Sequence, residues 1–337
     1  MKSIGVLGAG SWGTALSVHL GRLDHDVCLW ARDQAIVDDM NGHRVNRVYL
    51  PAVTLPSTVS VTHRVADAVR GRDLIVAAIP SHGCRAVVRE AAVHANEGAV
   101  FVSATKGLEA DTLLRMSEVI AQEVGPARPV VVISGPTFAV EVARQLPTAI
   151  LAASSDAAAT ELVLAEFRGP YFRLYASDDV VGVEIGGAMK NIIAIAAGVV
   201  EGLGLGHNAL AALITRGLAE LSRLACAAGG RRDTLAGLSG LGDLVLTCTG
   251  DLSRNRRVGL ELAKGRSLPE ILAATRMVAE GVRTTGAALA LGKRYGVELP
   301  ITTQMAEVLG GRSDVRTAID ALMLRRQRAE AETGQAG

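Results

Sequence analysis

Lys190 is the residue whose setting most directly suggests chemistry. It is the one charged side chain between Gly186 and Val200, a run in which apolar residues fall on every face of a predicted helix. An ammonium group taken out of water is costly unless it is paired or its pKa falls. A lysine with a lowered pKa can donate a proton near neutral pH. The alternative is that the aliphatic stem lies along the core while the amine reaches water.

A glycine pattern lies near the N-terminus. Gly8, Gly10 and Gly13 form G-x-G-x-x-G between a short apolar strand at 3–7 and a helix-like run at 14–20. Gly8 makes the tight turn, Gly10 lets a pyrophosphate approach the backbone, and Gly13 lets the helix pack closely on the strand. The pyrophosphate would lie on free N–H groups at the helix N-terminus. The pattern therefore predicts dinucleotide binding, with a ligand-free glycine turn as the alternative.

The second predicted strand, 27–30, is followed by Ala31, Arg32 and Asp33. In dinucleotide-binding folds an acidic residue at this place binds the ribose 2′-hydroxyl of NAD, whereas an arginine accommodates the 2′-phosphate of NADP. Arg32 therefore favours NADPH (NADP) as the cofactor. Asp33 keeps NADH (NAD) possible.

Further strands and helices predict the fold of the first half. Helical segments separate apolar strands expected at 59–62, 74–79, 99–103, 130–134 and 148–152. This alternation predicts a parallel sheet covered on both faces, which is a doubly wound, Rossmann-like α/β domain over residues 1–178. Ligands of such sheets bind beyond the carboxyl ends of the strands.

That rule draws attention to polar residues that directly follow two of these strands. Lys106 offers a cation for a substrate oxygen or phosphate, although a solvated loop lysine is the alternative. Thr137 and the backbone around Gly135 offer hydrogen bonds, although Gly-Pro is also ordinary turn chemistry. We therefore treat these three residues as candidate substrate contacts.

The pattern changes beyond about residue 177. Long apolar helical runs are expected at 183–200, 209–227, 258–264, 284–295 and 301–309. These runs predict an all-α C-terminal domain over residues 179–326. The polar residues 327–337 are expected to form a disordered tail.

A basic cluster precedes one of these helices. Ser253 can cap the helix, and Arg254 and Asn255 then lie in its first turn. Cations in a first turn oppose the helix dipole, so the cluster makes more sense if an anion, above all a phosphate, binds there. The alternative is a basic, solvated helix start.

Composition limits the possible functions. With 337 residues, two domains are the natural expectation, and 49% hydrophobic with 20% charged residues is typical of a globular protein. The formal charge of +1 and 3% aromatic content give no reason to expect a nucleic-acid partner. Four scattered cysteines lack metal-ligand spacing and fit a reducing cytoplasm. Glycines interrupt the uncharged N-terminal run, so we expect neither a signal peptide nor a membrane span.

Several of these motifs together resemble one family, the bacterial type of NAD(P)-dependent glycerol-3-phosphate dehydrogenase. The resemblance covers nearly the whole chain and its most specific element surrounds Lys190. The motifs that carry it are Gly8 to Gly13 with Ser11-Trp12, Ser103 to Gly107, Ser134 to Ala139, Gly187 to Asn191 continuing through Glu201-Gly202 to Gly206 and Asn208, Gly240 to Leu244 with Thr247-Cys248, and Ser253 to Asn255.

The resemblance implies an oxidoreductase that interconverts sn-glycerol 3-phosphate and dihydroxyacetone phosphate with NAD(P)H, feeding glycerophospholipid synthesis. It implies that Lys190 is the catalytic proton donor and acceptor. The implied substrate contacts are Lys106, Gly135, Thr137, Lys190, Asp243, Ser253, Arg254 and Asn255. The implied cofactor contacts include the glycine loop and are Gly8, Gly10, Ser11, Trp12, Gly13, Arg32, Lys106, Ala139, Arg254, Val278 and Glu280. A homodimer is likewise implied, and no metal is.

One position departs from the family pattern. Relatives often carry a basic residue where this chain has Leu210. Two other functions stay open at this point. A two-domain NADP-dependent reductase of another small hydroxy or keto acid would lack the phosphate site at 253–257. A non-catalytic NADP-sensing protein would need neither that site nor a lysine in an apolar helix.

Overall fold

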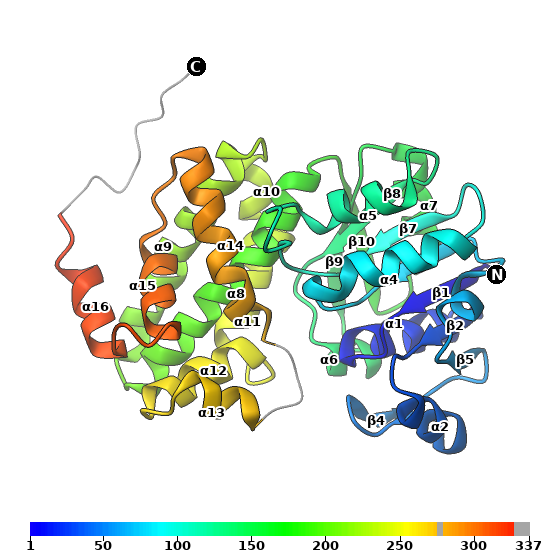
Figure 1. Cartoon of the computed structure of the whole chain (residues 1–337), viewed down its shortest axis with the longest axis horizontal. Helices are drawn as coiled ribbons and strands as arrows, with labels where there is room; N and C mark the ends of the chain where they lie inside the picture. Colours follow the sequence, from blue (N-terminus) through cyan, green and yellow to red (C-terminus); the bar gives the residue numbers. More distant parts are fainter. Residues whose placement is uncertain (275–278, 327–337) are drawn as a thin grey trace.

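The computed structural model describes residues 1–274 and 279–326. Within these ranges, eight strands form one sheet in the order β10-β9-β8-β7-β6-β1-β2-β5. Figure 1 shows this sheet and its helices beside a half built of helices alone. The strands are β1 (Ser3–Leu7), β2 (Asp26–Trp30), β5 (Val59–Thr62), β6 (Leu74–Ala77), β7 (Val100–Ser103), β8 (Val130–Ser134), β9 (Thr148–Ala153) and β10 (Phe172–Ser177).

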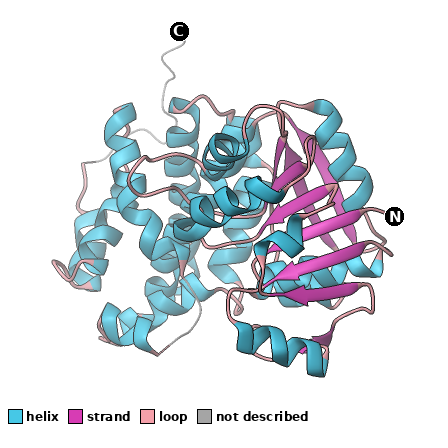
Figure 2. Cartoon of the chain, turned by 45° about the vertical axis from the view of Figure 1, so that its right-hand side comes forward, coloured by secondary structure: helices cyan, strands magenta, loops and turns pink. Residues whose placement is uncertain are grey.

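Helices cover both faces of the sheet, as Figure 2 shows. Ile4 and Val6 of β1 belong to one buried cluster with residues of α1, whereas Leu7 belongs to another with residues of α4 and α5. Alternation of side chains along a strand explains the division. The helices of this half are α1 (Ser11–Arg22), α2 (Gln34–His43), α3 (Val65–Val69), α4 (Ser81–His94), α5 (Met116–Val124), α6 (Ala139–Ala143) and α7 (Ala157–Phe167).

The sheet departs from the expected parallel arrangement at one place. β9 runs antiparallel to β8, and β10 is parallel to β9, while the other six strands are parallel. The helix between β8 and β9 has only five residues. Such a helix is about 7.5 Å long, whereas a five-residue strand is about 17 Å long. The connection therefore does not return the chain to the opposite edge, and β9 starts where β8 ends.

A small hairpin of β3 (Val45–Asn46) and β4 (Leu50–Thr54) was not expected from the sequence. The C-terminal half contains only helices among its described residues, which confirms the predicted fold class. They are α8 (Val180–Gly202), α9 (Gly206–Ala227), α10 (Arg232–Ala236), the π-helical turn η1 (Leu238–Gly242), α11 (Asp243–Thr249), α12 (Arg254–Ala263), α13 (Leu268–Ala273), α14 (Glu280–Tyr295), α15 (Pro300–Leu309) and α16 (Val315–Met323).

The lysine helix α8 is the centre of this half. Every residue from Gly182 to Val200 is buried, and α9, α11, α12 and α14 pack around it. By length and composition alone α8 could cross a membrane, but 89% of its most apolar window is buried inside the protein. The helix is therefore the core of the helical half, as its apolar faces predicted.

Candidate functional site

Lys190 lies near the middle of α8 and is 6% exposed. Its Nζ donates to Oδ1 of Asp243 at 2.5 Å and to Oγ1 of Thr247 at 2.8 Å. Asp243 and Thr247 are one turn apart on α11, so both side chains face α8. The amine is therefore paired in the interior instead of reaching open water along the core.

A second lysine shares the same carboxylate. Nζ of Lys106 lies 2.5 Å from Oδ2 of Asp243 and donates to the carbonyl oxygen of Gly135 at 3.2 Å. Oγ1 of Thr137 donates to the same carbonyl at 3.2 Å. The structure thus brings together five residues expected from the sequence to contact substrate, from the loops after β7 and β8 and from α8 and α11. Asp243 holds the two ammonium groups on either side of one buried carboxylate.

Burial lowers the pKa of Lys190 to about 7. Desolvation of the ammonium is the largest cause, and the charge of Asp243 opposes it, while the charge of Lys106 adds to it. A pKa in this range makes both protonation states accessible near neutral pH. Lys190 can therefore donate a proton in one direction of a reaction and accept one in the other.

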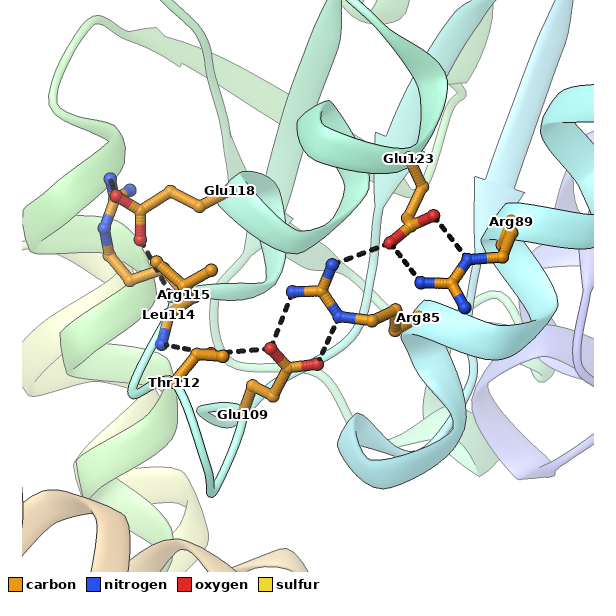
Figure 3. Close-up of polar contacts among 8 residues, drawn as sticks. All are labelled: Arg85, Arg89, Glu109, Thr112, Leu114, Arg115, Glu118 and Glu123. Atoms are coloured by element: carbon orange, nitrogen blue, oxygen red, sulfur yellow. Dashed lines mark hydrogen bonds and ion pairs between the residues drawn. The ribbon is translucent and has the colours of Figure 1, made fainter.

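The loop that follows Lys106 is held by ion pairs, shown in Figure 3. Arg85 of α4 binds Glu109 of this loop through two bonds of 2.7 Å, and it also binds Glu123 of α5 at 2.6 Å. Arg89 binds the other side of Glu123 at 2.8 Å. The bonds to both carboxylates raise the pKa of Arg85 above its usual value. The network therefore ties Glu109, near the start of the Lys106 loop, to α4 and, through Arg85, to α5.

The end of this loop, where α5 begins, is hydrogen-bonded to α8. Glu184, one and a half turns before Lys190, accepts from the backbone N–H of Ser117 at 2.8 Å and from its hydroxyl at 2.5 Å. Arg115 donates to the same carboxylate at 2.8 Å. Burial raises the pKa of Glu184, whereas Arg115 and Ser117 oppose that shift. The helix that carries Lys190 and the loop that follows Lys106 are therefore fixed to each other.

The glycine loop has the geometry that its sequence predicts. Gly8 has a φ of +114°, and a Cβ on Gly13 would lie 1.9 Å from the carbonyl oxygen of Gly8. A Cβ on Gly10 would meet nothing within 4 Å. Helix α1 starts at Ser11 with no side-chain cap and no acidic residue in its first turn. Open space over Gly10 and uncapped N–H groups fit a pyrophosphate.

Three other predicted cofactor contacts lie around this loop. Oγ of Ser11 donates to the carbonyl oxygen of Tyr49 at 2.8 Å, and Trp12 is half-buried against the adjacent core. Ala139 is the first residue of α6, which packs against α1. Ser11 and Trp12 thus form the start of α1 itself, and Ala139 begins the helix that packs against α1.

Arg32 and Asp33, which directly follow β2, differ in what they do. The Asp33 carboxylate caps α2, where Oδ1 accepts from the N–H of Ala35 at 2.9 Å. Arg32 is exposed and has no hydrogen-bond partner in the part of the chain that the structure describes. The acidic residue is thus engaged within the protein while the arginine is free to meet a ligand. This arrangement supports the interpretation that favours NADP.

The predicted anion site lies at the start of α12. Oγ of Ser253 accepts from the N–H of Arg256 at 3.2 Å, which confirms the predicted cap. Arg254 is exposed, yet desolvation by the surrounding protein lowers the pKa of its guanidinium, against the opposing charge of Glu280. An exposed cation surrounded by protein is suited to bind an anion that reaches it from solvent.

Asn255 has bonds that join three helices. Its Nδ2 donates to Oδ1 of Asn191 on α8 at 2.9 Å, and its Oδ1 accepts from the N–H of Gly281 on α14 at 3.0 Å. Asn191 directly follows Lys190 in the sequence. The start of α12 is therefore linked to the residue next to the catalytic candidate.

Glu280 joins the two halves of the molecule. As the first residue of α14, it accepts from the N–H of Ser81 at 3.2 Å and from its hydroxyl at 2.8 Å, at the start of α4. Val278, another predicted cofactor contact, lies outside the described residues. Leu210 of α9 packs half-buried against the helical core. Its place explains why an apolar side chain is stable there.

Two residues in this geometry had no predicted role. Thr247 binds Lys190, and its spacing of four from Asp243 would have placed both on one helical face. No helix was predicted at 238–252, between the helical run at 209–227 and the helix capped by Ser253, but the structure has η1 and α11 there. Ser81 binds Glu280 across 199 residues, and no local pattern indicates that contact.

Comparison with known proteins gives one family. The profile described as NAD-dependent glycerol-3-phosphate dehydrogenase N-terminus matches residues 3–160, and the corresponding C-terminus profile matches residues 179–320. The glycerol-3-phosphate dehydrogenase [NAD(P)+] of Koribacter versatilis is 53% identical, over 96% of this chain and 98% of that protein. The enzyme of the same name from Geobacter sulfurreducens is 50% identical, over 98% and 99%.

A solved structure agrees with this result. The crystal structure of glycerol-3-phosphate dehydrogenase from Coxiella burnetii has a TM-score of 0.93 and 41% identity to this chain. The match covers 96% of this chain and 99% of that one. Sequence and fold therefore point to the same family over nearly the full length.

Proposed function

Because the chain belongs to the NAD-dependent glycerol-3-phosphate dehydrogenase family, we propose that it interconverts sn-glycerol 3-phosphate and dihydroxyacetone phosphate. When bound, the nicotinamide dinucleotide supplies or accepts the hydride at C2 of the substrate. The observation that carries the proposal is the pairing of the buried Lys190 with Asp243. Burial lowers the pKa of this amine to about 7, which suits it to proton transfer near neutral pH.

Lys190 has the central role in the mechanism. In the reducing direction its ammonium gives a proton to the oxygen on C2, and in the oxidising direction its neutral amine takes that proton back. Asp243 and Thr247 orient the amine and stabilise its charged form. Lys106 places a second cation beside the developing negative oxygen.

The start of α12 has the complementary role of holding the phosphate. Ser253, Arg254 and Asn255 lie in or beside its first turn, where the helix dipole and a guanidinium both favour an anion. Binding energy from this remote group fixes C2 against the reacting residues. A small keto acid carries a carboxylate and no phosphate, so it would leave this phosphate site without a ligand.

A spectrophotometric assay tests the proposal. The loss of reduced-nicotinamide absorbance is followed with dihydroxyacetone phosphate, with dihydroxyacetone and with a small 2-keto acid, each with NADPH and with NADH. We expect efficient turnover with dihydroxyacetone phosphate and very poor turnover with the other two. Comparable kcat/KM for dihydroxyacetone and its phosphate would contradict the phosphate site at Ser253.

We further propose a cytoplasmic homodimer that serves glycerophospholipid synthesis. Support for a dimer comes from exposed apolar side chains in the helical half, namely Leu205 before α9, Leu241 of η1 and Val245 of α11. Four free cysteines fit a reducing compartment. Light scattering after size-exclusion chromatography measures the assembly state, and a monomeric mass at micromolar concentration would exclude the dimer.

The domain boundary is also a proposal. We place it between residues 178 and 179, because every strand of the large sheet among the described residues ends by Ser177 and α8 begins at Val180. Residues 1–178 then form the dinucleotide-binding domain, and residues 179–326 form the all-helical substrate domain.

A further inference from the structure

Two arginines and a histidine lie near the glycine loop without an anionic partner. The side chains of Arg32, His82 and Arg283 are exposed, and across residues 1–274 and 279–326 none of them has a hydrogen bond or ion pair. Neither His82 nor Arg283 has a role in the mechanism above. Exposed basic side chains of this kind are common on protein surfaces, so their arrangement must decide whether they form a site.

The first two flank the glycine loop within the sheet. Arg32 follows β2, and His82 is the second residue of α4, shortly after β6. β6 and β2 are the two neighbours of β1, and all three are parallel. Their carboxyl ends therefore meet at one edge, with the loop from Gly8 to Gly13 between Arg32 and His82.

The third basic side chain, Arg283, comes from the helical half. The bonds of Glu280 to Ser81 bring the start of α14 against the start of α4. Arg283 is three residues after Glu280, so it lies on the same face of α14, and His82 directly follows Ser81. One interhelical contact thus places Arg283 near His82.

The electrostatic influences on His82 agree with this placement. Desolvation lowers the pKa of His82 most, and the charges of Arg283 and Arg32 lower it further, whereas Glu280 raises it. Glu280 is the one carboxylate among these influences, and Ser81 already donates two hydrogen bonds to it. The two guanidinium groups repel each other, and they disfavour protonation of the imidazole near them. An anion bound among the three side chains would offset both effects.

We propose that His82 and Arg283 join Arg32 in binding a phosphate of the dinucleotide cofactor. This inference rests on the proposed dinucleotide chemistry and adds two residues to it. The helical half then contributes the guanidinium of Arg283 beside Arg32 and His82 of the sheet half. Either the 2′-phosphate or the pyrophosphate supplies the anionic oxygens, because both belong to the ligand expected over the glycine loop.

Titration calorimetry with NADPH and with NADH, without substrate, tests the proposal on the full chain. We expect R283A and H82A each to raise the Kd for NADPH about 10- to 100-fold, since each removes a hydrogen bond to a charged group. If the 2′-phosphate is the anion, the Kd for NADH stays unchanged, as it should in R32A. If the pyrophosphate is the anion, the Kd values of both nucleotides rise.

Matched controls exist on the same helices. R294A removes the same charge in the last turn of α14, and H94A removes the same ring in the last turn of α4. These positions are about 16 and 18 Å along each helix from the tested residues. We expect both controls to bind each nucleotide as the wild type does, and R283K to recover part of the lost affinity.

Three outcomes would overturn the inference. Kd values for both nucleotides within twofold of the wild type in R283A and H82A would remove these residues from the site. Equal losses in R294A and H94A would show a general effect of charge or folding instead. A wild-type chain that binds neither nucleotide would overturn the proposed function together with this inference. Unchanged melting temperatures exclude loss of folding as the cause of weaker binding.

Discussion

The glycine loop (Gly8 to Gly13) and the lysine–aspartate centre (Lys190, Lys106 and Asp243) are built in different ways. At the loop, the backbone forms the binding site, because Gly8, Gly10 and Gly13 shape a turn within six residues and expose N–H groups at the start of α1. At the centre, side chains form the site, because Lys190 and Lys106 contact Asp243, from which they are 53 and 137 residues apart in the sequence. A backbone site is thus fixed by local sterics, whereas a side-chain site depends on packing between distant elements.

The two regions should therefore respond differently to substitution. A change at the centre removes a chemical group and leaves the fold, whereas a change at the loop moves backbone. The following predictions test this difference, beginning with the largest effect.

Lys190→Ala should lower kcat for dihydroxyacetone phosphate roughly 100- to 10,000-fold, which is the usual contribution of a positioned proton donor. The Kd for NADPH should stay near the wild-type value, because the glycine loop is separate from α8. Steady-state kinetics and calorimetry measure the two quantities. Turnover close to that of the wild type would remove Lys190 from the mechanism.

Gly13→Ala should destabilise the protein by about 1–3 kcal/mol, which is typical of overpacking, and weaken nucleotide binding. The added Cβ would lie 1.9 Å from the carbonyl oxygen of Gly8, which is backbone and does not rotate away. Gly10→Ala is the matched control, since its Cβ would meet nothing within 4 Å.

We expect Gly10→Ala to melt near the wild-type temperature and yet bind NADPH more weakly, because the methyl group occupies the space of the pyrophosphate. Thermal unfolding and calorimetry separate the two effects. Equal loss of stability in both variants would contradict the distinct roles given to these glycines.

The pH dependence of the rate gives the smallest expected effect. The pKa of Lys190 is lowered to about 7, so the ammonium needed for reduction is present below that pH and is lost above it. The reduction rate should fall about tenfold for each pH unit above 7, and the oxidation rate should fall similarly below 7. Rates that do not change between pH 6 and 8.5 in both directions would show that Lys190 does not titrate in the reaction.

The sequence predicted much of the fold, and its errors have physical causes. The strand at β9 was expected, but its reversed direction depends on the length of α6, which periodicity does not give. The helix α11 was missed because glycines usually mark turns, whereas here packing against α8 stabilises helical backbone. The cap at Ser253 was predicted correctly because capping depends only on neighbouring residues.

What the sequence determined by itself is local. The spacing of Gly8, Gly10 and Gly13 and the apolar faces around Lys190 follow from backbone sterics and helical period, so they can be recognised without coordinates. Only the tertiary structure shows that Asp243 is the carboxylate paired with Lys190 and that Glu280 accepts hydrogen bonds from Ser81. Such contacts depend on how distant helices and strands pack, because a charge buried far from water is stable only where packing brings its partner within hydrogen-bond distance.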